Sequence, residues 1–115
     1  MAQYQHLPIY KLTYDLLFRV IQVTKNYPRE YKYTLGQKLK DEIIELVVFI
    51  YKANTAENKG QHIEIILERI QVIQVMIRLS HDLRILPRGH YADLAEKTDS
   101  LGRQAQGWLK SLGKK

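Results

Sequence analysis

A chain of 115 residues is long enough to bury one hydrophobic core and too short for two domains, so we expect a single domain over residues 1–115. Its 45% hydrophobic and 26% charged residues indicate a folded globular protein, and the absence of cysteine excludes disulfides, thiolate metal sites and cysteine nucleophiles. The formal net charge of +6 is concentrated between Arg19 and Lys40 and after Ser100, which indicates either a polyanionic partner or a solvated basic surface.

The first predicted helix spans residues 8–26. Pro8 suits its first turn because the missing N–H would have had no intrahelical acceptor there. Apolar residues then recur every three or four positions: Ile9, Leu12, Leu16, Leu17, Val20 and Val23. A second, aromatic row follows at i, i+4 and i+8: Tyr10, Tyr14 and Phe18. Apolar side chains therefore cover more of this helix than one core-facing side requires, which indicates deep burial or a partner.

Residues 27–33 form a connection in which tyrosines alternate with cations. Tyr27, Tyr31 and Tyr33 are interleaved with Arg29 and Lys32. Such a pattern can stack nucleic-acid bases and hold phosphates. Half-buried tyrosines that cap the end of a helical bundle produce the same pattern. We favour the cap, and the sequence leaves both interpretations open.

The second predicted helix spans residues 34–54. Thr34 and Gln37 are expected to form a capping box at its start, in which the hydroxyl accepts from a backbone N–H and the amide side chain bonds back. Its core-facing side carries a row of apolar residues at helical spacing: Leu35, Leu39, Ile43, Leu46, Val47 and Ile50.

The third predicted helix spans residues 61–84 and follows a polar turn at residues 54–60. One side carries a regular apolar row: Ile63, Ile66, Leu67, Ile70, Ile73 and Ile77. Further apolar residues lie around the helix: Ile65, Val72, Val75, Met76 and Leu79. Because only one side of a helix in a small bundle can face the core, we infer that the remainder meets another subunit.

The fourth predicted helix spans residues 90–112, after a break that contains Pro87 and Gly89. Its apolar seam steps by three or four throughout: Tyr91, Leu94, Thr98, Leu101, Ala105, Trp108 and Leu112. The single tryptophan on this seam is expected in the core. Four helices with short connections and no period-two alternation predict an all-α protein, an antiparallel up-down-up-down four-helix bundle.

The sequence offers no arrangement for catalysis, so we expect a non-enzyme without a metal or cofactor. A di-iron bundle requires a Glu-x-x-His element, which does not occur, and none of the four histidines has a ligand-spaced second histidine. Ser80, His81 and Asp82 are helical neighbours that point in different directions and cannot form a proton relay. The glycines are scattered, which excludes a nucleotide-binding loop.

No segment predicts a membrane protein. The longest uncharged, apolar-rich helical stretch, residues 70–77, is far short of the roughly 18 residues that a bilayer span requires. Residues 1–11 show no targeting pattern, so we expect a cytoplasmic protein.

Four features together resemble the accessory variability determinant (Avd) proteins of diversity-generating retroelements: the tyrosine-rich first helix, the connection from Tyr27 to Leu39, the turn from Ala53 to Lys59 and the helix with Trp108. Proteins of this family are small four-helix bundles that assemble into basic pentameric barrels. They bind the element's reverse transcriptase and nucleic acid, and they assist mutagenic copying of a template RNA. The resemblance therefore implies a homopentamer with a reverse transcriptase and RNA or DNA as partners.

A sister group, encoded by intervening sequences in bacterial large-subunit ribosomal RNA genes, shares the Pro-Arg-Glu element at residues 28–30. In that group the next helix carries an Arg-Arg-Ala run and a Ser-Ile-Pro-x-Asn-Ile-Ala-Glu-Gly ending. Here residues 40–44 and 49–54 hold Lys-Asp-Glu-Ile-Ile and Phe-Ile-Tyr-Lys-Ala-Asn, so the Avd group fits better. A structural four-helix interaction module with no nucleic-acid role is the alternative.

Under the Avd hypothesis, lysine and arginine side chains mainly contact phosphates, which position a polymer without reading its bases. The candidate contacts are Arg29, Lys32, Lys38, Lys40, Arg78, Arg84, Arg88, Arg103 and Lys110. The candidate oligomer interface consists of Tyr10, Tyr14, Phe18, Ile65, Val72, Met76 and Leu79. Each cation taken alone is also compatible with a solvated surface charge.

Overall fold

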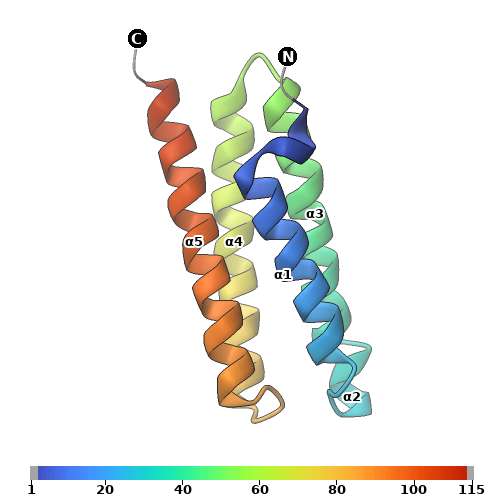
Figure 1. Ribbon diagram of the computed structural model, residues 1–115. Helices are drawn as coiled ribbons and strands as arrows, with labels where there is room; N and C mark the ends of the chain where they lie inside the picture. The colour runs from blue at the N-terminus through green and yellow to red at the C-terminus, as the bar shows by residue number, and fades with distance from the viewer. Residues whose placement is uncertain (1–2, 114–115) are drawn as a thin grey trace.

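The computed structural model describes residues 3–113 of the chain (Figure 1). Within this range the chain is helical and contains no strand, so the all-α prediction is confirmed. A short 3-10 helix and a one-turn helix accompany four long helices. In chain order the elements are η1 (Tyr4–His6), α1 (Pro8–Thr24), α2 (Arg29–Lys32), α3 (Leu35–Thr55), α4 (Lys59–Asp82) and α5 (Arg88–Leu112).

Each long helix begins and ends within two residues of its predicted bounds. Helix α1 ends early because the N–H of Tyr27 bonds to the Thr24 carbonyl at 3.1 Å, three residues back, which tightens the chain into a turn. Helix α5 begins early because Pro87 is extended and its carbonyl accepts the N–H of Tyr91 at 2.9 Å. Arg88 therefore becomes the first helical residue.

The long helices lie side by side in an elongated bundle of 49 × 20 × 18 Å (Figure 1). Helix α1 contacts α3 and α5, and α4 contacts the same two helices, so α1 and α4 lie diagonally across the bundle. The α3–α4 connection lies at the same end as the two chain termini. Helix α2 and the α4–α5 connection lie at the opposite end, which we call the elbow end.

Buried apolar side chains from all four long helices meet along the axis of the bundle. They recur every three or four residues because 3.6 residues complete one helical turn. Burial of each large side chain contributes about 2 kcal/mol to the free energy of unfolding. The largest fully buried side chains are Leu16, Leu39, Ile43, Leu46, Ile50, Ile63, Ile66, Ile73, Ile77, Leu86, Leu94 and Leu101.

Several apolar side chains lie differently from the prediction; Leu112, expected on the apolar seam of the last helix, is exposed. Trp108, expected in the core, is half-buried and packs at its edge, where it lines a hollow with Leu7 and Pro8. Met76, proposed for an oligomer interface, is only 9% exposed and belongs to the core. It lies two turns from Arg69, whose side chain reaches helix α3, so Met76 shares the flank of α4 that α3 covers.

Charged pairs join neighbouring helices outside the core. Arg69 Nη1 donates to both carboxylate oxygens of Glu42, at 2.9 and 3.2 Å, and so joins α4 to α3. Lys97 Nζ lies 2.7 Å from Asp93 and 3.6 Å from Asp15, and so joins α5 to α1. The hydrogen bond to Asp93, opposed by burial and supported by the charges of both carboxylates, raises the pKa of Lys97.

The predicted capping box at the start of α3 is wrong. Thr34 does precede the helix, but its hydroxyl donates to the Glu30 carbonyl at 2.6 Å and caps no α3 backbone N–H. Gln37 donates to the Asp41 carboxylate at 3.0 Å, one turn further on. The one-turn helix α2 brings the Glu30 carbonyl within reach of Thr34, and this local bond replaces the cap.

Candidate nucleic-acid interface

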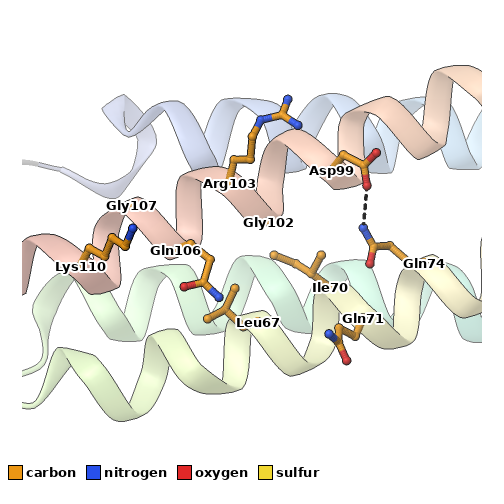
Figure 2. Close-up of a pocket in the computed structure, with 10 residues that line it drawn as sticks. All are labelled: Leu67, Ile70, Gln71, Gln74, Asp99, Gly102, Arg103, Gln106, Gly107 and Lys110. Carbon is orange, nitrogen blue, oxygen red and sulfur yellow. Dashed lines mark hydrogen bonds between the residues drawn. The ribbon is translucent and has the colours of Figure 1, made fainter.

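The nine candidate cations fall into two groups. Seven belong to segments at the elbow end: α2, the first turns of α3, the last turns of α4 and the α4–α5 connection. They are Arg29, Lys32, Lys38, Lys40, Arg78, Arg84 and Arg88. Arg103 and Lys110 lie apart from them, on the half of α5 that leads to the other end (Figures 1 and 2).

Positive charge is concentrated at the elbow end. Residues 25–40 and 78–90, which contain the seven candidates and Lys25, together hold eight basic and two acidic side chains, a net charge of +6 that equals the formal net charge of the whole chain. Such a concentration attracts phosphate through the local potential and the release of counterions. The cationic surface predicted from the sequence therefore has one location in the folded protein.

Most of these cations are available to a ligand. Arg29, Lys38, Arg84 and Arg88 are exposed and make no ion pair within residues 3–113. Arg78 differs, because its Nε lies 3.2 Å from Asp82 on the same helix; the hydrogen bond and the charge of that carboxylate raise the pKa of Arg78. Its charge is thus partly neutralised, which makes Arg78 a weaker candidate than its neighbours.

The three tyrosines of the elbow take different places. Tyr27 is only 4% exposed and Tyr31 is half-buried against the core, whereas Tyr33 is 67% exposed. Lys32 Nζ lies 5.9 Å from the centre of the Tyr33 ring, within cation–π range. The two interpretations of the tyrosine pattern therefore separate: Tyr27 and Tyr31 cap the bundle, and Tyr33 presents a ring to solvent next to a cation.

Arg84 lies in a backbone conformation that arginine seldom adopts. Its φ is 64°, in the left-handed region where a helix end normally holds glycine or asparagine. The conformation turns the chain so that the N–H groups of Ile85 and Leu86 both bond to the Ser80 carbonyl, at 3.1 and 3.2 Å. A residue with a side chain pays roughly 1 kcal/mol for this conformation. An exposed cation therefore occupies this position despite the backbone strain.

Arg103 and Lys110 line a groove of about 480 Å³ between α4 and α5. Leu67, Gln74 and Gln106 also line it, and Gln74 donates to Asp99 across it at 3.1 Å. Figure 2 shows Gln106 directed towards Leu67 and Arg103 directed away from α4. The groove combines two cations with the Asp99 carboxylate, so it carries a much smaller surplus of positive charge than the elbow end.

Apolar side chains proposed for an oligomer interface lie largely on the surface. Tyr14 and Phe18 on α1 are 57% and 55% exposed, and Val72 and Leu79 on α4 are also exposed. Tyr10 and Ile65 are half-buried. Since α1 and α4 are diagonal, these residues form two separate faces, one on each helix.

Several exposed apolar residues were absent from the candidate interface. They are Ile21, Tyr33, Ile44, Val48, Tyr51, Val75, Leu83 and Leu112. The aromatic cluster also extends beyond α1, because the Tyr4 ring contacts the rings of Tyr10 and Tyr51 edge-on, with centroids 5.3 and 5.2 Å apart. Helical spacing alone could have identified one of these residues, since Ile21 continues the row of Tyr14 and Phe18 by one turn.

The residue types of a catalytic triad at positions 80–82 serve local structure. Ser80 Oγ donates to the Met76 carbonyl at 3.0 Å, Asp82 pairs with Arg78, and the His81 ring stacks on Tyr91 with centroids 4.3 Å apart. Among the described residues, no group of three or more histidine, aspartate and glutamate side chains is placed to hold a metal ion. Within residues 3–113, no helix combines the length and the apolar character that a membrane span requires.

Comparison with known protein families decides the affiliation of the chain. A family model described as bAvd-like matches residues 7–112. The chain belongs to the bAvd-like family. The resemblance inferred from the sequence is thereby confirmed, and the family associates the chain with accessory, non-catalytic proteins of diversity-generating retroelements. Neither the curated proteins nor the solved structures include a significant match to this bAvd-like chain.

Proposed function

We propose that this protein is a non-enzymatic, oligomeric accessory protein that binds a reverse transcriptase and nucleic acid during mutagenic retrohoming of a diversity-generating retroelement. The nucleic acid is the template RNA or its DNA copy, and the protein acts in the cytoplasm. Its building block is an antiparallel up-down-up-down bundle of four helices. Family membership over residues 7–112 supports the role, and the charge distribution supports the polymer contact.

The observation that carries the nucleic-acid proposal is the concentration of exposed cations at the elbow end. Arginine and lysine side chains without acidic partners hold phosphates with little sequence preference. About five phosphate contacts would give a plot of log K against log salt with a slope near −4.5 for duplex DNA. With this slope, a fourfold rise in salt concentration lowers the affinity by roughly several hundredfold.

The test measures binding of labelled single-stranded RNA and duplex DNA, each of about 20 nucleotides or base pairs, across a salt series. Combined replacement Arg29→Glu, Arg84→Glu and Arg88→Glu should abolish binding to both. The control, Arg103→Glu with Lys110→Glu, reverses two exposed cations away from the elbow end and should retain most of the affinity. Salt-insensitive binding by the wild-type protein would exclude this mechanism.

The two apolar faces support the oligomer. The face with Tyr14 and Phe18 differs from the one with Val72 and Leu79, so contact between the two unlike faces of neighbouring subunits is head-to-tail and can close into a ring. Five subunits are implied by the family resemblance. Phe18→Glu should dissociate the assembly in sedimentation velocity, whereas Lys11→Glu, at an exposed position of the same helix, should not. A wild-type monomer at micromolar concentration would refute the ring.

The contact with the enzyme is tested by co-purification of the protein with the reverse transcriptase of a diversity-generating retroelement. We expect the wild-type oligomer to retain the enzyme in the presence of nuclease, which separates protein contact from a nucleic-acid bridge. A structural module without a nucleic-acid role also suits the exposed apolar faces. If the elbow-end triple variant binds polymer and enzyme as well as the wild-type protein does, these cations are spectators. The alternative replaces the proposal if the wild-type protein binds neither polymer at low salt.

A further inference from the structure

The elbow end is built from two chain segments that are far apart in sequence. Helix α2 carries Arg29 and Lys32, and the α4–α5 connection carries Arg84. A phosphate chain can use both segments at once only if their relative position is fixed. The candidate for fixing it is Tyr27, a buried residue that directly precedes Pro28 and α2.

On one side, Tyr27 packs beneath the start of α3. A Cβ atom built on Gly36 would lie 3.4 Å from Tyr27 Cδ2 and 3.3 Å from the Tyr31 carbonyl oxygen, so any larger residue would push against the elbow. Gly36 itself is buried. The absence of a side chain at Gly36 therefore lets the elbow fold back closely onto α3.

On the other side, Tyr27 meets the residue that shapes the α4–α5 connection. Ser80 is fully buried, and its carbonyl accepts the two N–H groups that follow Arg84. Burial raises the pKa of Tyr27, and the adjacent Ser80 side chain opposes part of this rise. The Tyr27 hydroxyl makes no well-formed hydrogen bond within residues 3–113, so packing of the ring is the main contact.

We propose that Tyr27 is a positioning residue that combines α2 and the α4–α5 connection into one phosphate-binding surface for a polynucleotide backbone. This inference rests on the proposed function and adds to it the residue that assembles the surface. Tyr27 does not touch the polymer, because its ring is buried; it acts through Arg29 and Lys32. Removing the ring should release the elbow while Arg84 keeps its place.

The test is a set of binding measurements with the labelled RNA and duplex DNA described above. Tyr27→Leu should lower affinity at low salt about tenfold and reduce the magnitude of the duplex-DNA salt slope by about two, the share of Arg29 and Lys32. Helical circular dichroism should stay at the wild-type level. The control, Phe49→Leu, removes an aromatic ring of α3 that is partly buried against the core of the bundle. It should leave the salt slope unchanged.

A double-mutant cycle separates positioning from general loss of structure. In the wild-type background, Lys32→Gln should reduce the magnitude of the salt slope by about one. In the Tyr27→Leu background it should have no further effect, whereas Arg84→Gln should keep its full effect in both backgrounds. If Lys32→Gln instead has an undiminished effect in the Tyr27→Leu background, the positioning role is overturned and the proposed function stays intact.

A second variant keeps the inference testable if Tyr27→Leu does not fold. Gly36→Val leaves Tyr27 unchanged but pushes against the elbow, so it should reduce the salt slope in the same direction. Gly102→Val, where an added Cβ meets nothing within 4 Å, is its control. Wild-type slopes for folded Gly36→Val would refute the inference, while absence of polymer binding by the wild-type protein would refute the proposed function itself.

Discussion

Replacing Arg84 by glycine should change stability and binding in opposite directions. The φ of 64° costs arginine roughly 1 kcal/mol, and glycine adopts this conformation without that cost. Part of the gain is lost because glycine makes the unfolded chain more flexible, so we expect a net stabilisation of about 0.5 kcal/mol. For a chain of this length the unfolding entropy converts that free energy into a rise in Tm of about 2 °C.

The same substitution removes one exposed cation from the elbow end. We expect the magnitude of the duplex-DNA salt slope to fall by about 0.9, together with a several-fold loss of affinity at low salt. Calorimetry gives the Tm, and fluorescence anisotropy gives the salt series. Arg84→Lys is the matched control, because it keeps both the charge and the backbone strain and should therefore change neither quantity appreciably.

Two results would refute the reasoning about Arg84. A lower Tm for Arg84→Gly would mean that the arginine side chain stabilises the connection and that relief of strain is the smaller effect. Wild-type binding by a stabilised Arg84→Gly variant would mean that the cation is a spectator. Only a gain in stability combined with a loss of binding agrees with a phosphate-contacting residue held against strain.

Three further predictions concern the stability of the bundle. Burial raises the pKa of Tyr27, so the contribution of its neutral hydroxyl to stability is constant below the ordinary pKa near 10 and is lost as pH rises through the folded-state pKa. Tyr27→Phe should remove this alkaline loss of stability in urea titrations at pH 9 to about 11. Gly102→Ala should stabilise α5 by about 0.5–1 kcal/mol in urea unfolding, since the added Cβ meets nothing within 4 Å, and a loss of stability would contradict the open space. Glu42→Gln should cost about 1 kcal/mol by weakening the bond to Arg69 between α3 and α4, whereas Glu45→Gln at an exposed position should cost less than half as much; equal effects would mean that the pair adds nothing.

Helical periodicity predicted the fold because it reports a property of each segment alone. Rows such as Leu39, Ile43, Leu46 and Ile50 repeat with the helical turn, and all four are fully buried. The same signal is weak where apolar residues surround a helix. On α4 it could not distinguish Met76, which α3 covers, from Val72, which remains exposed, because the difference depends on a neighbouring helix.

The elbow shows the same limit for polar and aromatic residues. Tyr27 and Tyr33 belong to one alternating pattern, yet one is buried and the other is largely exposed. Thr34 precedes α3 as predicted, but its hydroxyl bonds to the carbonyl of Glu30 in preference to capping the helix. Composition and spacing leave such choices open because two local partners compete, and the backbone path of the folded elbow decides between them.

Residue types and their spacing determined four long helices, a cationic surplus and the family resemblance, since each of these is a property of the chain read in order. The tertiary structure alone decided that seven of the nine candidate cations gather at one end while Arg103 and Lys110 lie apart. It also placed Arg84 in the left-handed region and buried Tyr27 against Gly36 at the start of α3. Both outcomes depend on how the bundle brings the ends of its helices together, a long-range relation that no local pattern encodes.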